Sequence, residues 1–205
     1  METSQIKAVI WDMGGVLLRT EDKAPRTALA QQYHMTYEEI DDIVFGSDSA
    51  QQAFVGEIDI ASHWVAVRER FCLDEAGLRK FQQQFWAGDF IDRTLVDFIC
   101  SIRARCKTAL LSNAWSDTRA KLESRGVLAC FDEAVISAEV GLAKPDARIY
   151  RHTMRLLGAE PVEAIFVDDF IENVNAAREL GMVGVHFQGP EQVVAEVSRL
   201  LNAGG

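Results

Sequence analysis

The sequence has few basic residues relative to acidic ones. Lysine and arginine together number 21, against 31 aspartate and glutamate residues, which gives a formal net charge of −10. Domains that bind nucleic acid usually carry a basic patch, so this balance argues against a nucleic-acid partner. The same negative charge repels an anionic small molecule unless its binding site is locally positive or holds a cation.

The sequence also lacks features that mark membrane, secreted and zinc-binding proteins. No apolar run approaches the ~18 residues of a membrane-spanning helix, so no membrane partner is expected. The first residues, METSQIKAVIWD, show no secretory pattern. No CxxC or Cys/His metal spacing is present, and we interpret the cysteines as reduced thiols: Cys72, Cys100, Cys106 and Cys130. These absences predict a cytoplasmic protein.

The pattern of apolar residues predicts an α/β fold. Strands are expected over 6–12, 108–111, 133–137, 164–167 and 183–186, and helices over 95–105, 116–125, 147–157 and 172–180. Such alternation implies right-handed crossovers and a doubly wound parallel sheet of the Rossmann-like type. Between 19 and 92 the apolar spacing is helical, no strand is expected, and the segment is an insertion. The tail LNAGG is expected to be frayed.

The segment AVIWDMGGVLLRT, residues 8–20, is the first candidate site. Its apolar run leads into Asp12 at the end of an expected strand, and two glycines follow shortly after. A carboxylate at a strand tip beside flexible backbone suits a nucleophile or a metal ligand. An ordinary strand end followed by a turn is the alternative, and this segment alone does not decide between the two.

Two later segments carry polar residues that can bind an anion. In TALLSNAW, the Ser112 hydroxyl and the Asn113 backbone N–H can hold a phosphate oxygen, although both residue types also commonly begin helices. In GLAKPD, Lys144 precedes Pro145, which favours extended backbone. Its ammonium can hold a nucleophile and an anion together, and a solvated surface lysine is the alternative.

The segment EAIFVDDFIENVNAARELGM, residues 163–182, carries adjacent carboxylates at another strand tip. Asp168 and Asp169 repel each other unless a cation or a proton intervenes, and they offer the hard oxygens that Mg²⁺ requires. An acidic helix start is the alternative interpretation. Metal binding is favoured because both acids fall at the same place relative to a strand as Asp12. Ligands bind beyond the carboxyl ends of parallel strands, so the four segments are expected to converge.

The ordered set resembles the haloacid dehalogenase-like (HAD) hydrolase superfamily. In that family a strand ends in a nucleophilic Asp, followed along the chain by a Ser/Thr tip, a Lys and an acidic pair. The matching residues here are Asp12, Ser112, Lys144, Asp168 and Asp169. The resemblance runs from about residue 8 to 185. It is greatest to the subgroup with a small helical (C1-type) cap, which includes sugar-phosphate phosphatases and the N-terminal domain of soluble epoxide hydrolase.

The resemblance implies a Rossmann-like core over 1–18 and 93–205 and a helical cap over 19–92. It implies a Mg²⁺-dependent phosphatase that acts on a small phosphorylated metabolite through an aspartyl-phosphate on Asp12. Phosphate-binding groups would come from Ser112, Asn113 and Lys144. The metal ligands it implies are Asp12, the Gly14 carbonyl and Asp169, with Asp168 as a ligand or just behind one.

One position departs from the family pattern. Phosphatases of the family usually carry a second Asp two places after the nucleophile, which protonates the leaving group and later activates water, and here that place is Gly14. General acid–base catalysis is typically worth about 10²–10⁴ in rate. Three functions stay open: a phosphatase that is slow or uses another acid, a hydrolase of another bond such as carbon–halogen, and a catalytically impaired binding protein.

The insertion offers weaker candidates for substrate contact. For Asp48, Gln52, Glu57 and His63 a solvated helix face is the favoured interpretation. Trp115, next to the Ser112–Asn113 tip, is expected either to line the pocket or to pack against the cap. The sequence specifies neither the substrate nor the oligomeric state.

Overall fold

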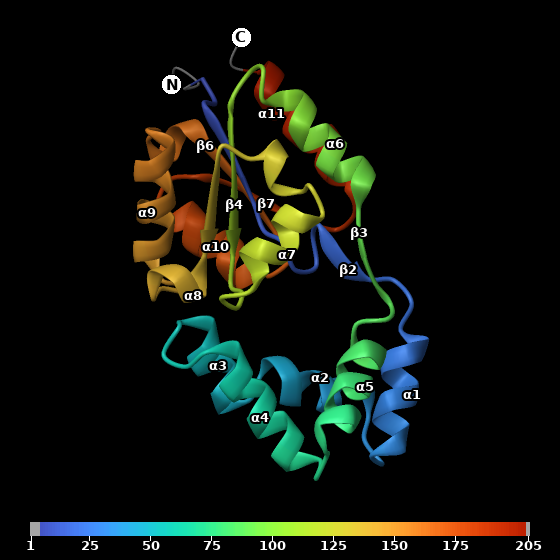
Figure 1. The fold of residues 1–205 in the computed structure, drawn as a ribbon. Helices are drawn as coiled ribbons and strands as arrows, with labels where there is room; N and C mark the ends of the chain where they lie inside the picture. Colours follow the sequence, from blue (N-terminus) through green and yellow to red (C-terminus); the bar gives the residue numbers. More distant parts are fainter. Residues whose placement is uncertain (1–4, 204–205) are drawn as a thin grey trace.

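The computed structural model describes residues 5–203, and it contains a five-stranded parallel sheet (Figure 1). The strands lie in the order β5-β4-β1-β6-β7. Their bounds are β1 Ala8–Trp11, β4 Lys107–Ser112, β5 Glu133–Ile136, β6 Ala164–Asp168 and β7 Val183–His186. All four pairings between neighbours are parallel, so the strands end at the same edge. The predicted Rossmann-like α/β fold is confirmed.

Helices cover both faces of this sheet. They are α6 Arg93–Ile102, α7 Thr118–Ser124, α8 Ser137–Val140, α9 Ala147–Leu157, α10 Ile171–Glu179 and α11 Pro190–Asn202, with short 3-10 turns η1 Leu128–Cys130 and η2 Pro161–Glu163. Side chains of α6 and α11 pack on one face, and those of α9 and α10 on the other. None of the helices in residues 5–203 is both long and apolar enough to cross a membrane.

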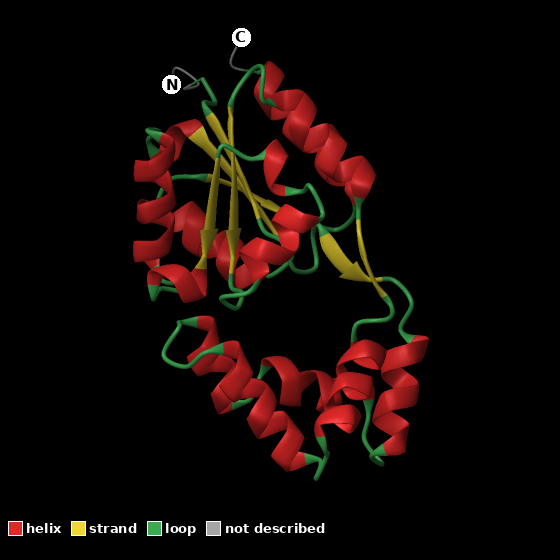
Figure 2. Cartoon of the chain, in the orientation of Figure 1, coloured by secondary structure: helices red, strands yellow, loops and turns green. Residues whose placement is uncertain are grey.

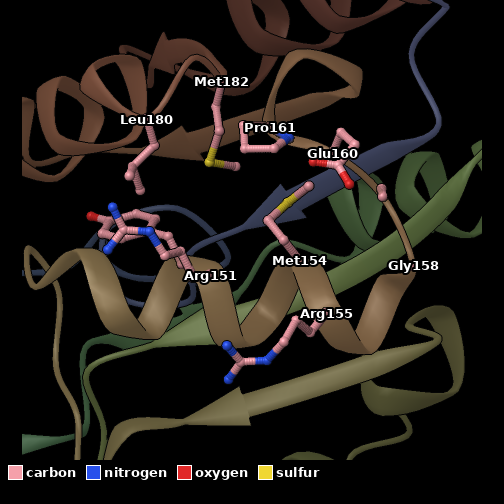
Figure 3. A pocket seen from close by; sticks show the side chains of 10 residues that line it. Arg151, Met154, Arg155, Gly158, Glu160, Pro161, Leu180 and Met182 are labelled. Atoms are coloured by element: carbon pink, nitrogen blue, oxygen red, sulfur yellow. The ribbon is translucent and has the colours of Figure 1, made fainter.

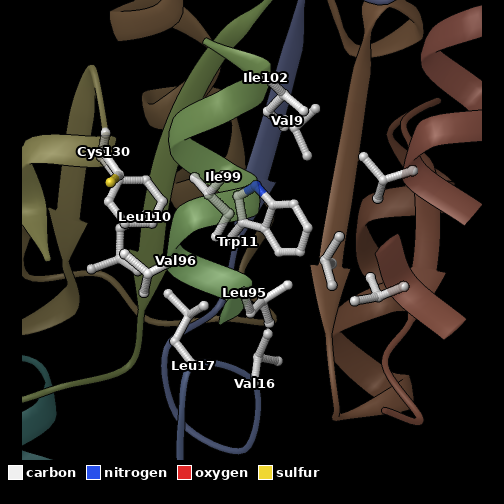
Figure 4. Close-up of a cluster of buried hydrophobic side chains, with 14 of the residues drawn as sticks. Val9, Trp11, Val16, Leu17, Leu95, Val96, Ile99, Ile102, Leu110 and Cys130 are labelled. Atoms are coloured by element: carbon white, nitrogen blue, oxygen red, sulfur yellow. The ribbon is translucent and has the colours of Figure 1, made fainter. Parts of the chain in front are cut away.

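Both faces of the central strand β1 are buried, which explains its uninterrupted apolar sequence. Val9 and Trp11 point toward α6, where they meet Leu95 and Ile99 (Figure 4). Their neighbours Ala8 and Ile10 join the layer under α9. Successive side chains of a strand point to opposite faces, so a strand between two helical layers needs apolar residues at every position. The position of Asp12 at the strand end follows from this packing.

The insertion forms a separate group of five helices, which we call the insert (Figure 2). They are α1 Ala24–Gln32, α2 Tyr37–Phe45, α3 Asp48–Phe54, α4 Ile60–Arg70 and α5 Glu75–Phe85. Two short antiparallel strands, β2 Leu18–Thr20 and β3 Asp89–Ile91, connect it to the sheet domain. The prediction of no strand in this region was therefore wrong at its two edges, where three-residue strands are too short to give a periodic pattern.

Buried ion pairs fix the ribbon of β2 and β3. The Arg26 guanidinium, 4% exposed as a side chain, lies 3.0 Å from Asp89 Oδ1 and donates to the Phe85 carbonyl at 3.2 Å. On the sheet side, Arg19 donates to Asp92 Oδ2 at 2.8 Å. Breaking a buried pair by removing one partner leaves an uncompensated charge, so these contacts hold the ribbon in one geometry.

His63 of α4 is fully buried in the insert, which neither interpretation of the sequence foresaw. Its Nδ1 lies 2.8 Å from Ser49 Oγ, and its ring packs on Trp64 with centroids 5.3 Å apart. Burial lowers the pKa of His63 below its usual value. The other three insert candidates, Asp48, Gln52 and Glu57, are solvent-exposed.

This burial predicts a loss of stability in mild acid. Below the unfolded pKa of about 6.5 the unfolded chain takes up a proton at His63 while the folded chain stays neutral. The free energy of unfolding should then decrease as pH falls, by at most about 1.4 kcal/mol per pH unit from this group. Urea unfolding of wild type and His63→Gln between pH 7.5 and 5.5 measures it. An equal slope in both proteins would show that His63 is not the source.

Two of the four cysteines are bonded to each other. Cys100 and Cys130 form a disulfide between α6 and η1, so the prediction of four reduced thiols was wrong for this pair; Cys72 and Cys106 are free. Residues thirty positions apart meet here only because the fold brings them together.

Of the tail predicted to be frayed, Leu201 and Asn202 belong to α11, whereas 204–205 lie outside the described residues.

Candidate active site

The predicted site residues meet at the carboxyl edge of the sheet. Asp12 follows the last residue of β1, Ser112 ends β4 and Asp168 ends β6. Lys144 lies in the loop between α8 and α9. Because β4, β1 and β6 are neighbours, their ends bring together side chains that are far apart in the sequence.

Lys144 links two carboxylates in the centre of the site. Its Nζ donates to Asp12 Oδ1 and to Asp168 Oδ2, both at 2.6 Å. The three side chains are nearly sealed from solvent, with exposed fractions of 2% for Lys144, 7% for Asp12 and 0% for Asp168. A buried charge requires a partner, and here each carboxylate has one in the same ammonium. The interpretation of Lys144 as a solvated surface residue is excluded.

Asn113 fixes the backbone of Lys144. Its side-chain amide donates to the Lys144 carbonyl at 2.8 Å, and its Oδ1 accepts from the Lys144 N–H at 2.8 Å. This pair of hydrogen bonds connects the tip of β4 to the lysine loop. The tip itself is held by Ser137, whose Oγ accepts from the Ala114 N–H at 2.9 Å. Asn113 is therefore bound through its side chain as well as available through its backbone.

Both oxygens of Asp168 are already used by protein donors. Oδ1 accepts from the Phe170 N–H at 2.8 Å, Oδ2 accepts from Lys144, and Asn173 Nδ2 lies 3.1 Å from each oxygen. A carboxylate with this many donors is held rigidly in one position. The two predicted roles for Asp168 were a metal ligand or a residue just behind one, and its contacts with Lys144, Phe170 and Asn173 fit the second role better.

Asp169 has a free carboxylate oxygen. Within residues 5–203, its Oδ1 is buried without a hydrogen-bond partner. The carboxylate lies against Gly15, which has φ of +73°, and a Cβ on Gly15 would come within 2.0 Å of Asp169 Oδ2. Its backbone carbonyl accepts from His186 Nε2 at 2.9 Å, which fixes the loop. Glycine is required at 15 both for its backbone conformation and for the space.

The carboxylates are arranged so that a cation fits among them. Asp12, Asp168 and Asp169 each offer an oxygen, and these atoms lie within 4.8 Å of one another. An orphaned buried oxygen costs free energy unless a ligand or a proton satisfies it. Hard carboxylate oxygens are the donors that Mg²⁺ prefers. The donor set and the free oxygen of Asp169 therefore fit a divalent cation.

The pKa shifts in the site also fit a bound cation. Burial raises the pKa of Asp12 to about 7, with Asp168 and Asp169 adding to the rise and Lys144 opposing it. Burial and the charge of Asp168 raise the pKa of Asp169 to about 6. Burial works against a charged Lys144, but the Asp12 and Asp168 carboxylates outweigh it and raise its pKa. Three carboxylates and one ammonium leave an excess of negative charge that a cation would compensate.

Gly14 leaves open space beside this group. No heavy atom outside its chain neighbours lies within 4 Å of the position that a Cβ would take there. Gly14 has no left-handed φ, unlike Gly15, so its backbone accepts other residue types. The missing side chain at this position is therefore a property of the sequence and not a requirement of the fold.

Three residues that hold the site were missed as site residues in the sequence. Asn173 binds the Asp168 carboxylate, His186 binds the Asp169 carbonyl, and Ser137 binds Ala114, two residues beyond Ser112. Their positions carried a weak signal, because Asn173 follows the acidic pair on α10 and His186 ends β7. The motif spacing alone does not show which atoms they bind.

A cavity of about 550 Å³ lies elsewhere on the sheet domain. It is lined by Arg151, Met154 and Arg155 of α9 together with Leu180 and Met182, and the Met154 side chain points toward Met182 (Figure 3). None of the residues that line it is one of the predicted site residues. The candidate site at the sheet edge and this cavity therefore share no residue.

Comparison with known proteins agrees with this arrangement. The model of the haloacid dehalogenase-like hydrolase family matches residues 6–181. The chain belongs to this family, and it is a hydrolase by that membership. The predicted resemblance is thus confirmed over most of the chain.

Individual relatives are more distant. A bifunctional epoxide hydrolase 2 from Sus scrofa is 28% identical over 225 residues, covering 95% of this chain but only 39% of its own length. A sesquiterpene phosphatase from Aspergillus oryzae is 39% identical over 71 residues, which are 35% of this chain and 36% of that protein. The chain therefore spans less than half of either relative's length.

A solved structure shares the fold. A HAD family enzyme from Bacteroides thetaiotaomicron, in complex with magnesium and inorganic phosphate, superimposes with a TM-score of 0.73 at 23% identity. The match covers 88% of this chain and 93% of that one.

Proposed function

We propose that this hydrolase is a Mg²⁺-dependent phosphatase that acts on a small phosphorylated metabolite, with Asp12 as the nucleophile. The observation that carries the proposal is the Asp12 carboxylate, bound through Oδ1 to Lys144 and lying beside the unpartnered oxygen of Asp169. The division into a core over 1–18 and 93–205 and a cap over 19–92 is part of the same proposal.

The metal would be held by Asp12 and Asp169 together with the Gly14 carbonyl. Asp168, whose oxygens accept from Lys144, Phe170 and Asn173, would support the site from behind. When bound, Mg²⁺ supplies charge that neutralises the phosphoryl oxygens and brings them toward the nucleophile.

The protein groups would carry out a two-step displacement. Asp12 attacks phosphorus through its carboxylate, the bond from phosphorus to the leaving oxygen breaks, and an aspartyl-phosphate forms. The Ser112 hydroxyl, the Asn113 N–H and Lys144 Nζ would bind the phosphoryl oxygens, where negative charge must be stabilised. Water then attacks phosphorus and restores Asp12. With Gly14 in place of an acid, the leaving group takes its proton from water or from the substrate itself.

Two relatives support this class of substrate. The Aspergillus protein is named as a sesquiterpene phosphatase, and the Bacteroides enzyme was solved with magnesium and inorganic phosphate. The negative charge of the chain fits a small substrate better than a nucleic acid. A cytoplasmic location stays a proposal, and the Cys100–Cys130 disulfide counts against it because disulfides are rare in the cytosol.

A binding protein without turnover is the second candidate, and Gly14 is the observation that favours it. Such a protein would still bind a phosphorylated ligand at the same edge of the sheet, since Lys144 and the carboxylates are in place. It would release no phosphate, so a turnover assay separates the two candidates.

The test is phosphate release from sugar phosphates, nucleotides and p-nitrophenyl phosphate, with Mg²⁺ or with EDTA. We expect release only with Mg²⁺, and a decrease of about 10⁴-fold or more in Asp12→Asn, as for removal of a nucleophile. Asp97→Asn, a change in α6 away from the site, is the matched control and should leave the rate unchanged. Release that is indifferent to Asp12 would overturn the proposal, and binding without release would favour the second candidate.

A further inference from the structure

His186 is a side chain of the edge strand that reaches the proposed metal site. It ends β7, which lies at one edge of the sheet beside β6, and it is paired in register with Asp168, the last residue of β6. Its residue is half-buried. Because Asp169 directly follows Asp168, the loop that carries Asp169 lies beside the end of β7.

The regular backbone hydrogen bonds on either side of Asp169 do not include its carbonyl. The Phe187 N–H donates to the Asp168 carbonyl at 2.9 Å, and two N–H groups in the first turn of α10 donate to the Phe170 carbonyl at 3.1 and 3.2 Å. The carbonyl of Asp169 lies between these two anchored residues. Its partner is a side chain, since His186 Nε2 lies 2.9 Å from it.

The ring of His186 is the donor in this contact. A carbonyl oxygen can only accept a hydrogen bond, so the proton lies on Nε2, and the contact with Asp169 sets the protonation of the ring. The bond fixes the peptide plane that follows Asp169. It therefore fixes the stretch of backbone from which the Asp169 carboxylate projects.

The position of the Asp169 carboxylate depends on this backbone. Within residues 5–203 no donor binds its buried Oδ1, and its Oδ2 lies where a Cβ on Gly15 would come within 2.0 Å. The oxygens offered by Asp12, Asp168 and Asp169 lie within 4.8 Å of one another. Mg²⁺ requires near-octahedral geometry with oxygens at about 2.0–2.1 Å, so a shift of ~1 Å in one carboxylate weakens binding.

We propose that His186 is a positioning residue for the metal ligand Asp169, and that the hydrogen bond from its ring increases the affinity of the site for a divalent cation. This inference rests on the metal site of the proposed function. His186 acts through the backbone of Asp169 and is not itself a ligand. Loss of an outer-shell partner typically lowers metal affinity by about 10–100-fold.

The experiment measures Mn²⁺ binding by electron paramagnetic resonance, with Mg²⁺ as the competitor and no substrate present. His186→Phe keeps a ring but has no donor, whereas the amide nitrogen of His186→Gln can take the place of Nε2. His152→Phe, the same change in α9, is the matched control. We expect the Mg²⁺ dissociation constant to rise about 10–100-fold in His186→Phe. It should return near the wild-type value in His186→Gln and stay there in His152→Phe.

The outcomes separate this inference from the function on which it rests. A wild-type dissociation constant in His186→Phe, or an equal rise in His186→Phe and His186→Gln, overturns the role of the ring donor. Wild type that binds the cation no more tightly than Asp169→Asn overturns this inference and the proposed metal site together. Binding that depends on Asp169 and His186 but is accompanied by no phosphate release overturns the phosphatase proposal alone. Urea unfolding in EDTA checks that His186→Phe folds, and His186→Leu replaces it in the same titration if it does not.

Discussion

Replacing Gly14 by aspartate is expected to increase the rate of phosphate release by about 10²–10⁴, the usual contribution of a general acid–base group. The side chain meets no atom within 4 Å of its Cβ, and the backbone at Gly14 is not left-handed. The new carboxyl lies two residues after Asp12, where it can protonate the leaving oxygen and then activate water. Steady-state release with Mg²⁺ in excess measures the gain.

Two matched variants separate the effect of the new carboxyl group on the rate from the effect of filling the space at position 14. Gly14→Asn has nearly the same shape but cannot donate and accept a proton in the same way, and it should leave the rate near that of wild type. Gly15→Asp places the same group one residue later, where it would collide with Asp169, and should abolish release. A Gly14→Asp protein that folds and binds Mg²⁺ but gains no more than Gly14→Asn would show that acid catalysis does not limit this enzyme.

Replacing Lys144 by methionine is expected to lower the free energy of unfolding by about 3–5 kcal/mol, as for other buried charge pairs that lose one partner. The change leaves the Asp12 and Asp168 carboxylates buried without the ammonium that both contact at 2.6 Å. Phosphate release should be lost as well, because Asp12 loses the group that orients it. Urea unfolding in EDTA at neutral pH measures the change in the free energy of unfolding.

Two comparisons make the Lys144 prediction specific. Lys107→Met removes an exposed lysine whose Nζ lies 3.9 Å from Asp132, and it should cost less than about 1 kcal/mol. The double variant Lys144→Met/Asp168→Asn also removes one of the two buried carboxylates that lost their partner. It should therefore regain part of the free energy of unfolding but none of the activity. An equal loss of stability in the single and double variants would show that charge is not the cause.

The sequence predicts the sheet well because its strands are buried on both sides. The runs around Val9, Leu110 and Ile165 are apolar at every position, and each ends in a polar residue at the sheet edge. The bounds of α9 and β7 agree with the prediction at both ends. These elements are determined by local patterns, which is why reasoning from periodicity succeeds for them.

Elements that depend on distant contacts were missed. The ribbon of β2 and β3 joins strands of three residues that are about seventy positions apart, and the Cys100–Cys130 bond joins α6 to η1. No local pattern predicts such pairings. Helix α11 was also not predicted, although its sequence carries local signals for a helix. Pro190 is its first residue, and Val193 and Val197 lie four positions apart on its buried side.

The candidate site also has a part that local sequence patterns predict and a part that they do not. Which residues meet was predictable, because parallel strands bring Asp12, Ser112 and Asp168 to one edge. What each residue binds was not, because that depends on side-chain geometry. Asp168 is surrounded by donors whereas its neighbour Asp169 has a free oxygen. The family resemblance implied Asp169 as a metal ligand, but the residue pattern alone does not show which donors each of these two adjacent acids meets.

The most direct measurement of the central claim is the covalent state of Asp12 during turnover. With glycine at position 14, no carboxylate is present there to act as a general base on the attacking water. Hydrolysis of the aspartyl-phosphate should therefore be slow, and the intermediate should accumulate. We expect mass spectrometry of acid-quenched protein, after mixing with Mg²⁺ and a phosphate ester that it hydrolyses, to find one phosphoryl group on the peptide that carries Asp12. That group should be absent with EDTA and in Asp12→Asn. Phosphate release without a phosphoryl group on Asp12, or with one on another residue, would contradict the account.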